Sequence, residues 1–169
     1  MDKRYTVAVL VRNQFGVLNR VTSMFRRRQF NIDNLTVSET ESPDYSRITV
    51  QFAGERVTKQ QLVDQLYKLP DVCSIRELDN ENAVSFELLL IKLKNDPASR
   101  GDIRAAADAF EAKTVDYTRD SIVLRVTADS RRIDGFIDLM RDYEILEICR
   151  TGVVSLERGA DTIRKVTNL

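Results

Sequence analysis

The sequence predicts an α+β protein made of two consecutive ferredoxin-like domains, each with a four-stranded antiparallel sheet and two helices on one face. Apolar patterns typical of strands and helices follow one another in the order βαββαβ. After the polar stretch at residues 79–82, the same order begins again. The 169 residues and the 43% hydrophobic content are enough to build two small packed cores.

The first half opens with the apolar run Thr6 to Val11, which is typical of a buried strand. A helix ending near Arg28 should follow, because apolar residues recur at helical spacing. Alternating residues at 35–40 and 47–52 flank the turn Ser42-Pro43-Asp44 and predict a hairpin. The positions predicted to share one face of the first helix are Val17, Val21, Met24, Phe25 and Arg28.

A second helix and a fourth strand complete this half. Thr58 can cap the helix, and Pro70 stops it. The segment from Val72 to Leu78 then returns as a strand. The apolar residues assigned to this helix are Leu62, Val63, Leu66 and Leu69.

The second half repeats the architecture. The segment from Val84 to Leu93 predicts a strand, and residues 96–102 form a turn into a helix. Residues 114–118 and 121–127 predict a short hairpin, followed by a helix capped by Asp129 or Ser130 and a strand from Ile145 to Arg150. The apolar faces of the two helices are Ile103, Ala106, Ala107 and Phe110, and Ile133, Phe136, Ile137 and Met140.

Composition excludes several classes of function. Lys and Arg total 26, as do Asp and Glu, so no net field favours nucleic acid or an anionic membrane. The apolar runs are too short to span a membrane, and Met1 to Arg4 lacks the apolar core of a signal peptide, which predicts a cytoplasmic protein. Without histidine, the chain lacks the commonest general base and metal ligand. Cys73 and Cys149 lie in apolar segments and are expected to be buried thiols.

The most informative segment runs from Arg12 to Arg20, at the junction of the first strand and helix. Gly16 allows close approach of the backbone to a ligand, and the first helical turn presents N–H groups that attract an anion. Asn13 offers an amide oxygen to an ammonium group. These features suit a small zwitterion such as an amino acid, although an ordinary strand–helix connection also explains them. The second half has no copy of this Asn-x-x-Gly-x-Leu pattern, so any special site is expected in the first half.

Other clusters have structural explanations. The run Arg26-Arg27-Arg28 could bind phosphate, but basic residues also complement a helix C-terminus. An RNA-recognition fold has the same element order, yet its stacking aromatics are missing from the central strands. Asn31 could serve only as a turn residue. Two further groups of residues are candidates for acid–base chemistry. In the first half, the exposure of acidic side chains to solvent explains Asp33, Glu39, Glu41 and Asp44. In the second half, a turn between two strands explains Asp116, Tyr117 and Arg119.

Three blocks resemble one family. Residues 13–21, residues 28–37 and the ending 150–159 are similar to the signature of the small regulatory subunit of acetolactate synthase, also called acetohydroxyacid synthase. The resemblance covers essentially the whole chain. The first block alone is typical only of an ACT domain, a common amino-acid-sensing module.

The resemblance implies an ACT domain at residues 1–78, a linker at 79–83, a ferredoxin-like domain at 84–159 and a tail at 160–169. Members of the family perform no catalysis and carry no cofactor. They bind and activate the large catalytic subunit, which holds thiamine diphosphate, Mg²⁺ and FAD, and they confer feedback inhibition by valine or another branched-chain amino acid in branched-chain amino acid biosynthesis. ACT domains form homodimers with effectors at the interface.

Carried over by position, the effector site has two walls from two protomers. One wall consists of Asn13, Gly16, Val17 and Leu18, and the facing wall of Asn31 and Ile32. Gln29 departs from the family, which usually has Gly at this position. A non-glycine residue there is expected to strain or reshape a left-handed turn before Asn31.

Two other functions stay open at this level. A free-standing ACT-type sensor would bind an amino acid without an enzyme partner. A small enzyme on a ferredoxin-like fold is a poorer match, because the acids are scattered and histidine is missing.

Overall fold

The computed structural model describes residues 3–79 and 81–166, and within them the order βαββαβ occurs twice, as the sequence predicts. The last residues of the predicted tail, 167–169, and residue 80 of the predicted linker lie outside the described residues. By its contacts the chain divides into two compact units. Unit 1 contains the chain up to Ser85 and the segment from Val153 onward, and unit 2 is Phe86–Gly152. This division groups residues 153–159 with unit 1, whereas the sequence-based boundary groups them with the second domain.

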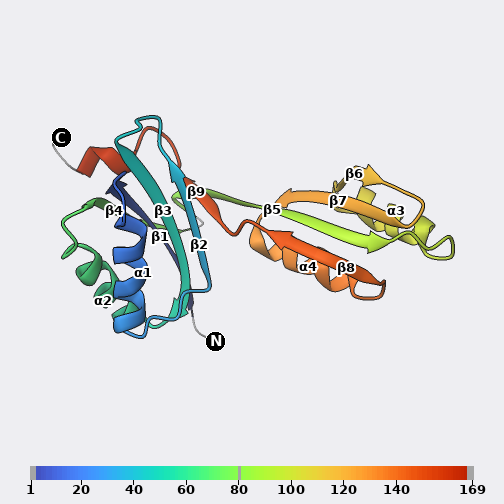
Figure 1. Cartoon of the computed structure of the whole chain (residues 1–169), viewed down its shortest axis with the longest axis horizontal. Helices are drawn as coiled ribbons and strands as arrows, with labels where there is room; N and C mark the ends of the chain where they lie inside the picture. Colours follow the sequence, from blue (N-terminus) through green and yellow to red (C-terminus); the bar gives the residue numbers. More distant parts are fainter. Residues whose placement is uncertain (1–2, 80, 167–169) are drawn as a thin grey trace. The chain divides into compact units, whose positions relative to one another are not determined.

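Unit 1 is a sheet with strand order β2-β3-β1-β4 and two helices on one face (Figure 1). All neighbouring strands are antiparallel, with Val7 opposite Val50 and Val9 opposite Ile75. The elements are β1 (Lys3–Arg12), α1 (Val17–Arg27), β2 (Asn34–Glu39), β3 (Tyr45–Gly54), α2 (Arg56–Leu66) and β4 (Val72–Leu78).

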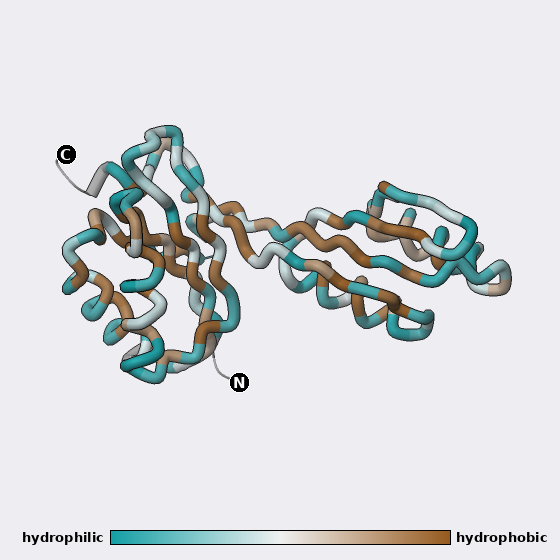
Figure 2. Tube along the Cα trace, in the orientation of Figure 1, coloured by the Kyte–Doolittle hydropathy of each residue, from teal (hydrophilic) through white to brown (hydrophobic). Residues whose placement is uncertain are grey.

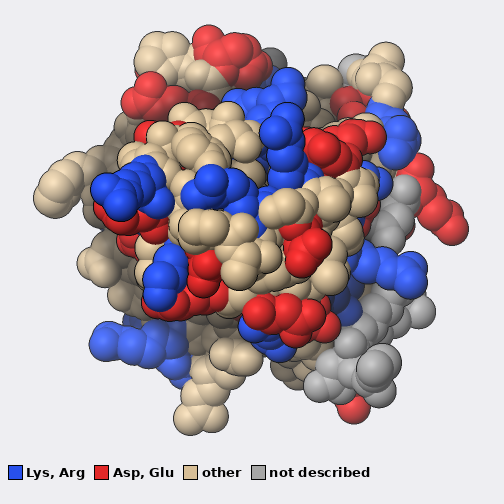
Figure 3. Space-filling view, turned by 90° about the vertical axis from the view of Figure 1, so that its right-hand side faces the viewer, with Lys and Arg blue, Asp and Glu red and all other residues tan. Residues whose placement is uncertain are grey.

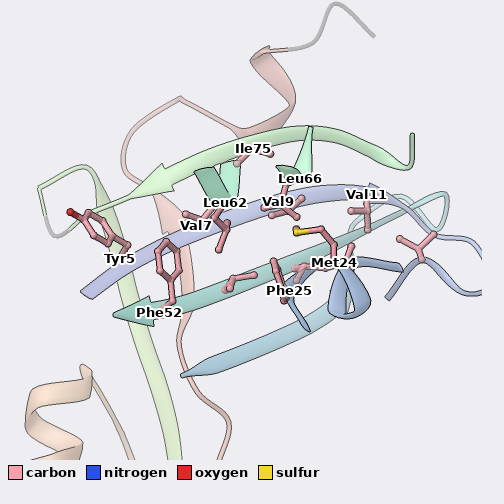
Figure 4. Packing of buried hydrophobic residues seen from close by; sticks show 14 residues of the cluster. Tyr5, Val7, Val9, Val11, Met24, Phe25, Phe52, Leu62, Leu66 and Ile75 are labelled. Atoms are coloured by element: carbon pink, nitrogen blue, oxygen red, sulfur yellow. The ribbon is translucent and has the colours of Figure 1, made fainter. Parts of the chain in front are cut away.

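The core of unit 1 lies between the sheet and its helices (Figure 4). Alternate residues of β1, among them Val7, Val9 and Val11, face the helices, because successive side chains of a strand point to opposite faces. Met24 and Phe25 of α1 pack against them, as predicted. Burial of such side chains contributes about 1.5–3 kcal/mol each.

Two details of α2 differ from the sequence prediction. The helix begins at Arg56 with Glu55 as its N-cap, so Thr58 is not the cap but lies in the first turn, beside Gly54. The helix ends at Leu66, and Leu69 lies in the turn that follows. Because β3 extends to Gly54, only Glu55 separates it from the helix, and the helix starts earlier than a Thr58 cap would allow.

The other face of the sheet in unit 1 is covered by the end of the described chain. This segment contains β9 (Val154–Glu157) and the 3-10 helix η1 (Ile163–Val166). Ile163 packs with Ala8 and Leu10, which point away from the helices. Arg47 of β3 donates to the carbonyl of Ser155 at 2.7 Å. Burial lowers the pKa of Arg47, and the nearby Glu157 carboxylate partly offsets this effect.

Unit 2 has the same topology, with strand order β6-β7-β5-β8. Asp129, one of the two predicted capping residues, caps α4 by accepting from the N–H of Arg132 at 2.9 Å. The first residues of β5 still belong to unit 1, and β5 also pairs with β9. The elements are β5 (Ala83–Lys94), α3 (Arg100–Ala109), β6 (Lys113–Tyr117), β7 (Ser121–Ala128), α4 (Ser130–Met140) and β8 (Ile145–Arg150).

Apolar residues run along the central strands, whereas apolar and hydrophilic residues alternate along the helices (Figure 2). The prediction of buried thiols is wrong for Cys149, which is exposed. It pairs with Leu90, on the sheet face opposite the core residues Leu89 and Ile91. Cys73 is half-buried. No described helix is long and apolar enough to cross a membrane.

A buried ion pair ties β8 to β5 inside unit 2. Glu87, whose side chain is only 3% exposed, accepts from Arg150 and from the Ser130 hydroxyl. Arg150 also donates to Asp134 at 2.7 Å. Burial alone would lower the pKa of Arg150, but its hydrogen bonds to Glu87 and Asp134 outweigh that effect and raise it. Arg150 therefore stays protonated throughout the neutral range.

Replacing Arg150 with alanine should lower the free energy of unfolding by about 3 kcal/mol, because it leaves the Glu87 carboxylate buried without its cation. Replacing Asp134 with alanine should cost less than about 1 kcal/mol, since that carboxylate is half exposed. Urea unfolding of the two variants measures both effects. Equal losses would contradict the assignment of Glu87 as the partner that depends on Arg150.

Candidate functional site

The connection between β1 and α1, residues 13–16, is a turn between a strand and a helix, as the sequence predicts. Gly16 has a φ of +83°, in the left-handed region that favours glycine. A Cβ atom built on it would lie 3.3 Å from Nη1 of Arg20. Gly16 is also the N-cap of α1 and supplies no side chain to cap the helix. Substitution of Gly16 therefore strains the backbone and crowds the start of α1.

The first turn of α1 presents donors to solvent. The N–H of Val17 donates to the carbonyl of Gln14 at 3.2 Å. The N–H groups of Leu18 and Asn19 have no acceptor in the part of the chain that the structure describes. Such free donors at a helix start attract an anion, an effect that the helix dipole reinforces.

Asn13 joins this connection to the β2–β3 hairpin through hydrogen bonds. Its N–H donates to the carbonyl of Asp44 at 2.7 Å. Its side-chain nitrogen donates to the carbonyl of Pro43 at 2.9 Å and to the Glu39 carboxylate at 3.1 Å. An amide nitrogen has two hydrogens, so both are engaged and the side-chain oxygen is left as an acceptor. That orientation suits an ammonium group.

Arg20 is a further residue of the site that the sequence patterns do not single out. Its Nε donates to the largely buried Asp71 carboxylate at 2.7 Å, which joins α1 to the residue before β4. The N–H of Arg12 donates to the backbone carbonyl of Asp71 at 2.9 Å. The signal in the sequence is spacing, because Arg20 lies four residues after Gly16 and helical side chains lean toward the N-terminus. Its guanidinium lies beside the helix start, where the Asp71 carboxylate balances its charge.

The remaining predicted residues divide between core and surface. Val17 is buried in the core of unit 1, so it offers a ligand only its backbone. Ile32 is partly buried and packs against the same core. Leu18 is 43% exposed, and the neighbouring Phe15 is fully exposed. Exposed apolar side chains beside free donors can contact an apolar ligand or a second protein chain.

Asn31 and Ile32 lie at the other end of α1. A helix of 11 residues spans about 16 Å at 1.5 Å per residue. Within one chain, the structure therefore does not bring these two residues together with Asn13 and Gly16. Asn31 is exposed in the connection to β2.

Gln29 adopts the left-handed turn that the sequence analysis anticipates. Its φ is +56°. The N–H of Phe30 donates to the carbonyl of Phe25 at 3.0 Å, and that of Gln29 to the carbonyl of Arg26 at 3.1 Å. This pair of bonds is a Schellman motif, in which glycine is usual at the left-handed position. The chain keeps the turn that precedes Asn31 and bears the strain of a non-glycine residue.

The three consecutive arginines close α1. Arg26 and Arg27 stand in its last turn, where they complement the helix dipole. Arg28 is the C-cap and is exposed, so it does not share the buried face of the helix as predicted. Its position just beyond the last helical residue turns it away from the apolar stripe.

The scattered acids have structural partners instead of a common site. Asp33 lies 3.9 Å from Arg4, and Glu41 pairs with Arg164 at 3.1 Å. Among the described residues, no group of three or more metal-ligating side chains is placed to hold an ion. Basic and acidic side chains are interspersed on the face shown in Figure 3.

Two family models together cover most of the chain. One, described as "AHAS small subunit-like ACT domain", matches residues 7–74, and one described as "Small subunit of acetolactate synthase" matches residues 86–159. The chain belongs to the acetolactate synthase small-subunit family. It is a regulatory small subunit by family, and the ACT match coincides with the half that carries Asn13 and Gly16.

Relatives of this small subunit match over nearly their whole length. The "Probable acetolactate synthase small subunit" of Archaeoglobus fulgidus is 44% identical over 156 residues, covering 92% of this chain and 98% of that relative. The small subunit of Bacillus subtilis is 41% identical over 155 residues, with 90% of each chain covered. The crystal structure of the Thermotoga maritima small subunit matches with a TM-score of 0.86 and 33% identity, covering 94% of this chain and 99% of that one. This match confirms the predicted fold.

Replacing Gln29 with glycine should raise the free energy of unfolding by about 0.5–1 kcal/mol, because glycine adopts the left-handed turn without strain. Replacing Arg28 with glycine, one residue earlier at a φ of −96°, should instead lower it by about 0.5–1 kcal/mol. Chemical denaturation compares the two variants. A loss of stability in both would show that the turn at Gln29 is not strained.

Proposed function

We propose that this small subunit activates the catalytic large subunit of acetolactate synthase and makes it sensitive to feedback inhibition by valine or another branched-chain amino acid. The chain itself performs no catalysis. The thiamine diphosphate, Mg²⁺ and FAD of the reaction belong to the large subunit in this proposal. Both subunits work in the cytoplasm, on the pathway to valine, leucine and isoleucine.

The observation that supports an amino-acid effector is the pairing of opposite hydrogen-bonding groups at one turn. The free N–H groups of Leu18 and Asn19 offer donors to a carboxylate, with the guanidinium of Arg20 nearby. The side-chain oxygen of Asn13 offers an acceptor to an ammonium group. An α-amino acid carries these two charges next to each other, so this turn suits both.

A second copy of the chain would complete the site. Asn31 and Ile32 lie about 16 Å from the Gly16 turn along the same helix, too far to touch one small ligand. In unit 1, β2 is an edge strand, and open sheet edges pair readily with another chain. We propose a homodimer through residues 1–78. In it, the wall of Asn31 and Ile32 from one copy faces the wall of Asn13, Gly16, Val17 and Leu18 from the other.

Inhibition then follows from linkage. An effector bound between two copies stabilises one dimer geometry over another by its differential affinity, which is typically about 1–3 kcal/mol. The hydrogen bonds from Asn13 to Glu39 and Pro43 join the turn directly to the β2–β3 hairpin. A shift of the turn therefore moves the hairpin, and the large subunit senses the change through its contact with this chain.

Replacing Gly16 with aspartate should abolish inhibition and leave activation of the large subunit intact. The new carboxylate occupies the place of the effector's carboxylate, and the left-handed backbone at this position adds strain of about 1–2 kcal/mol. Assays of the reconstituted complex with and without valine measure both properties, and co-purification shows whether the subunits still associate.

Gly159→Asp is the matched control. Gly159 also has a left-handed φ, of +72°, and a Cβ atom there would meet no heavy atom within 4 Å, so the change introduces similar strain away from the turn. This variant should keep its valine sensitivity. Undiminished inhibition in the Gly16→Asp complex would overturn the proposed site, and a wild-type chain that activates no large subunit would overturn the proposed function.

A further inference from the structure

Unit 2 contains a groove of about 340 Å³ between α3 and the β6–β7 hairpin, which we name the α3 groove. This volume is at the lower end of the range of small-molecule sites. Its floor contains side chains of the core of unit 2, and its rim carries charged residues of α3. The lining residues that bear on a ligand are Arg100, Ile103, Arg104, Ala107, Asp108 and Ala112.

The groove is open because of one small residue. Helix α3 ends in the same Schellman motif as α1: Glu111 has a φ of +56°, and the N–H of Ala112 donates to the carbonyl of Ala107 at 2.8 Å. Ala112 is thus the counterpart of Phe30, which packs against the core of unit 1. A methyl group in unit 2 stands where unit 1 has a benzyl group. The missing ring leaves space at the edge of the core.

Two arginines and one aspartate of α3 line the groove, at intervals of four residues along the helix. Arg100 is held in place, because its Nε donates to Asn95 at 2.7 Å and its guanidinium lies 6.0 Å from the centre of the Tyr117 ring. Arg104 follows four residues later and Asp108 four residues after that. Neither Arg104 nor Asp108 has an ion-pair partner in the described chain.

The spacing of these groups matches a zwitterion. Helical residues four apart have Cβ atoms about 5–6 Å from each other, so Arg104 and Asp108 lie on adjacent turns of one face. A carboxylate between Arg100 and Arg104 places the neighbouring ammonium group toward Asp108. Beside them, the half-buried Ala112 and the exposed ring of Tyr117 offer an apolar surface for a short side chain, whereas Ile103 and Ala107 are buried. Groups of opposite charge thus flank an apolar wall.

We propose that the α3 groove is a second binding site, for an α-amino acid with a short branched side chain. The choice of a branched-chain amino acid rests on the proposed function. The inference that the ligand is a zwitterion rests on the charges of the lining residues alone. A site in unit 2 departs from the expectation that any special site lies in the first half. The sequence pattern Asn-x-x-Gly-x-Leu has no second copy, but the site in unit 2 uses different residues.

Asn95 strengthens the parallel between the two units. It follows β5 as Asn13 follows β1, and its N–H donates to the carbonyl of Asp120 at 3.0 Å in the β6–β7 hairpin. Its side-chain nitrogen donates to the carbonyl of Thr118 at 2.6 Å. Its side-chain oxygen accepts a hydrogen bond from Nε of Arg100, so this asparagine positions a guanidinium group. Unlike Asn13, it therefore has no oxygen left to accept from the ammonium group of a ligand. In unit 2 the charged groups of a ligand therefore pair with the side chains of α3, namely Arg100, Arg104 and Asp108.

The test is titration calorimetry of valine, leucine and isoleucine into the full chain, in four versions. These are the wild type, Gly16→Asp, Ala112→Phe and the double variant. Ala112→Phe fills the groove with the side chain that unit 1 has at this position, and Ala105→Phe, an exposed alanine of the same helix outside the groove, is its control. Circular dichroism confirms that each variant is folded.

With Gly16→Asp, binding of at least one of the three amino acids should persist, and adding Ala112→Phe should remove it. Arg104→Ala in the Gly16→Asp background should weaken the remaining binding about tenfold or more, the loss expected for one charge-assisted contact. Arg131→Ala, an exposed arginine of α4, should have no effect.

Two results would overturn the α3 groove as a site. One is complete loss of binding in Gly16→Asp alone, and the other is residual binding that Ala112→Phe leaves unchanged. A different result would contradict the proposed function. It requires that the wild-type chain binds a branched-chain amino acid and that Gly16→Asp reduces this binding. Binding abolished by Ala112→Phe and untouched by Gly16→Asp would support the groove and contradict the site at Gly16.

Discussion

The hydrogen bonds of one asparagine hold the first connection of each unit in place. Asn13 donates to three groups of the β2–β3 region, and Asn95 donates twice to the β6–β7 hairpin. Each asparagine comes directly after the first strand of its unit, so the turn into the helix is fixed to the hairpin. In unit 1 the hairpin is joined in turn to the end of the described chain, because Arg164 pairs with Glu41 at 3.1 Å. The Gly16 turn and the hairpin therefore belong to one continuous set of polar contacts within unit 1.

Periodicity predicted most of the fold because the strands and helices bury one face each. The strands β4 and β8 begin and end at the residues predicted from the sequence, Val72 to Leu78 and Ile145 to Arg150. By contrast, β9 pairs with β5, some 70 residues earlier, and a four-residue strand has no periodic signal of its own. The exposure of Cys149 was not predictable either, because a strand with a few apolar residues does not reveal which of its faces a helix covers.

The candidate site was predictable only in part. The turns at Gly16 and Gln29 follow from local backbone chemistry, which one sequence displays. Spacing from Gly16 indicates that Arg20 lies beside the helix start, but its ion pair with Asp71, far along the chain, has no signal in the sequence. The role of Asn95 has no local signal, because the Asp-Pro pair that follows it is typical of an ordinary turn.

The proposed effector site, shared between two copies of the chain, is what would bring Asn31 and the distant Gly16 turn to one ligand. Mixing two variants whose effector sites are disabled tests this sharing most directly, because Gly16→Asp removes one wall and Asn31→Ala the other. In a heterodimer, the intact turn of one copy faces the intact Asn31 of its partner. Valine binding to the Gly16-dependent site, absent from each variant alone, should return on mixing to about one quarter of the wild-type capacity, since half the dimers are mixed and each has one good site of two. No recovery in a mixture shown to contain heterodimers would contradict a site shared between two protomers.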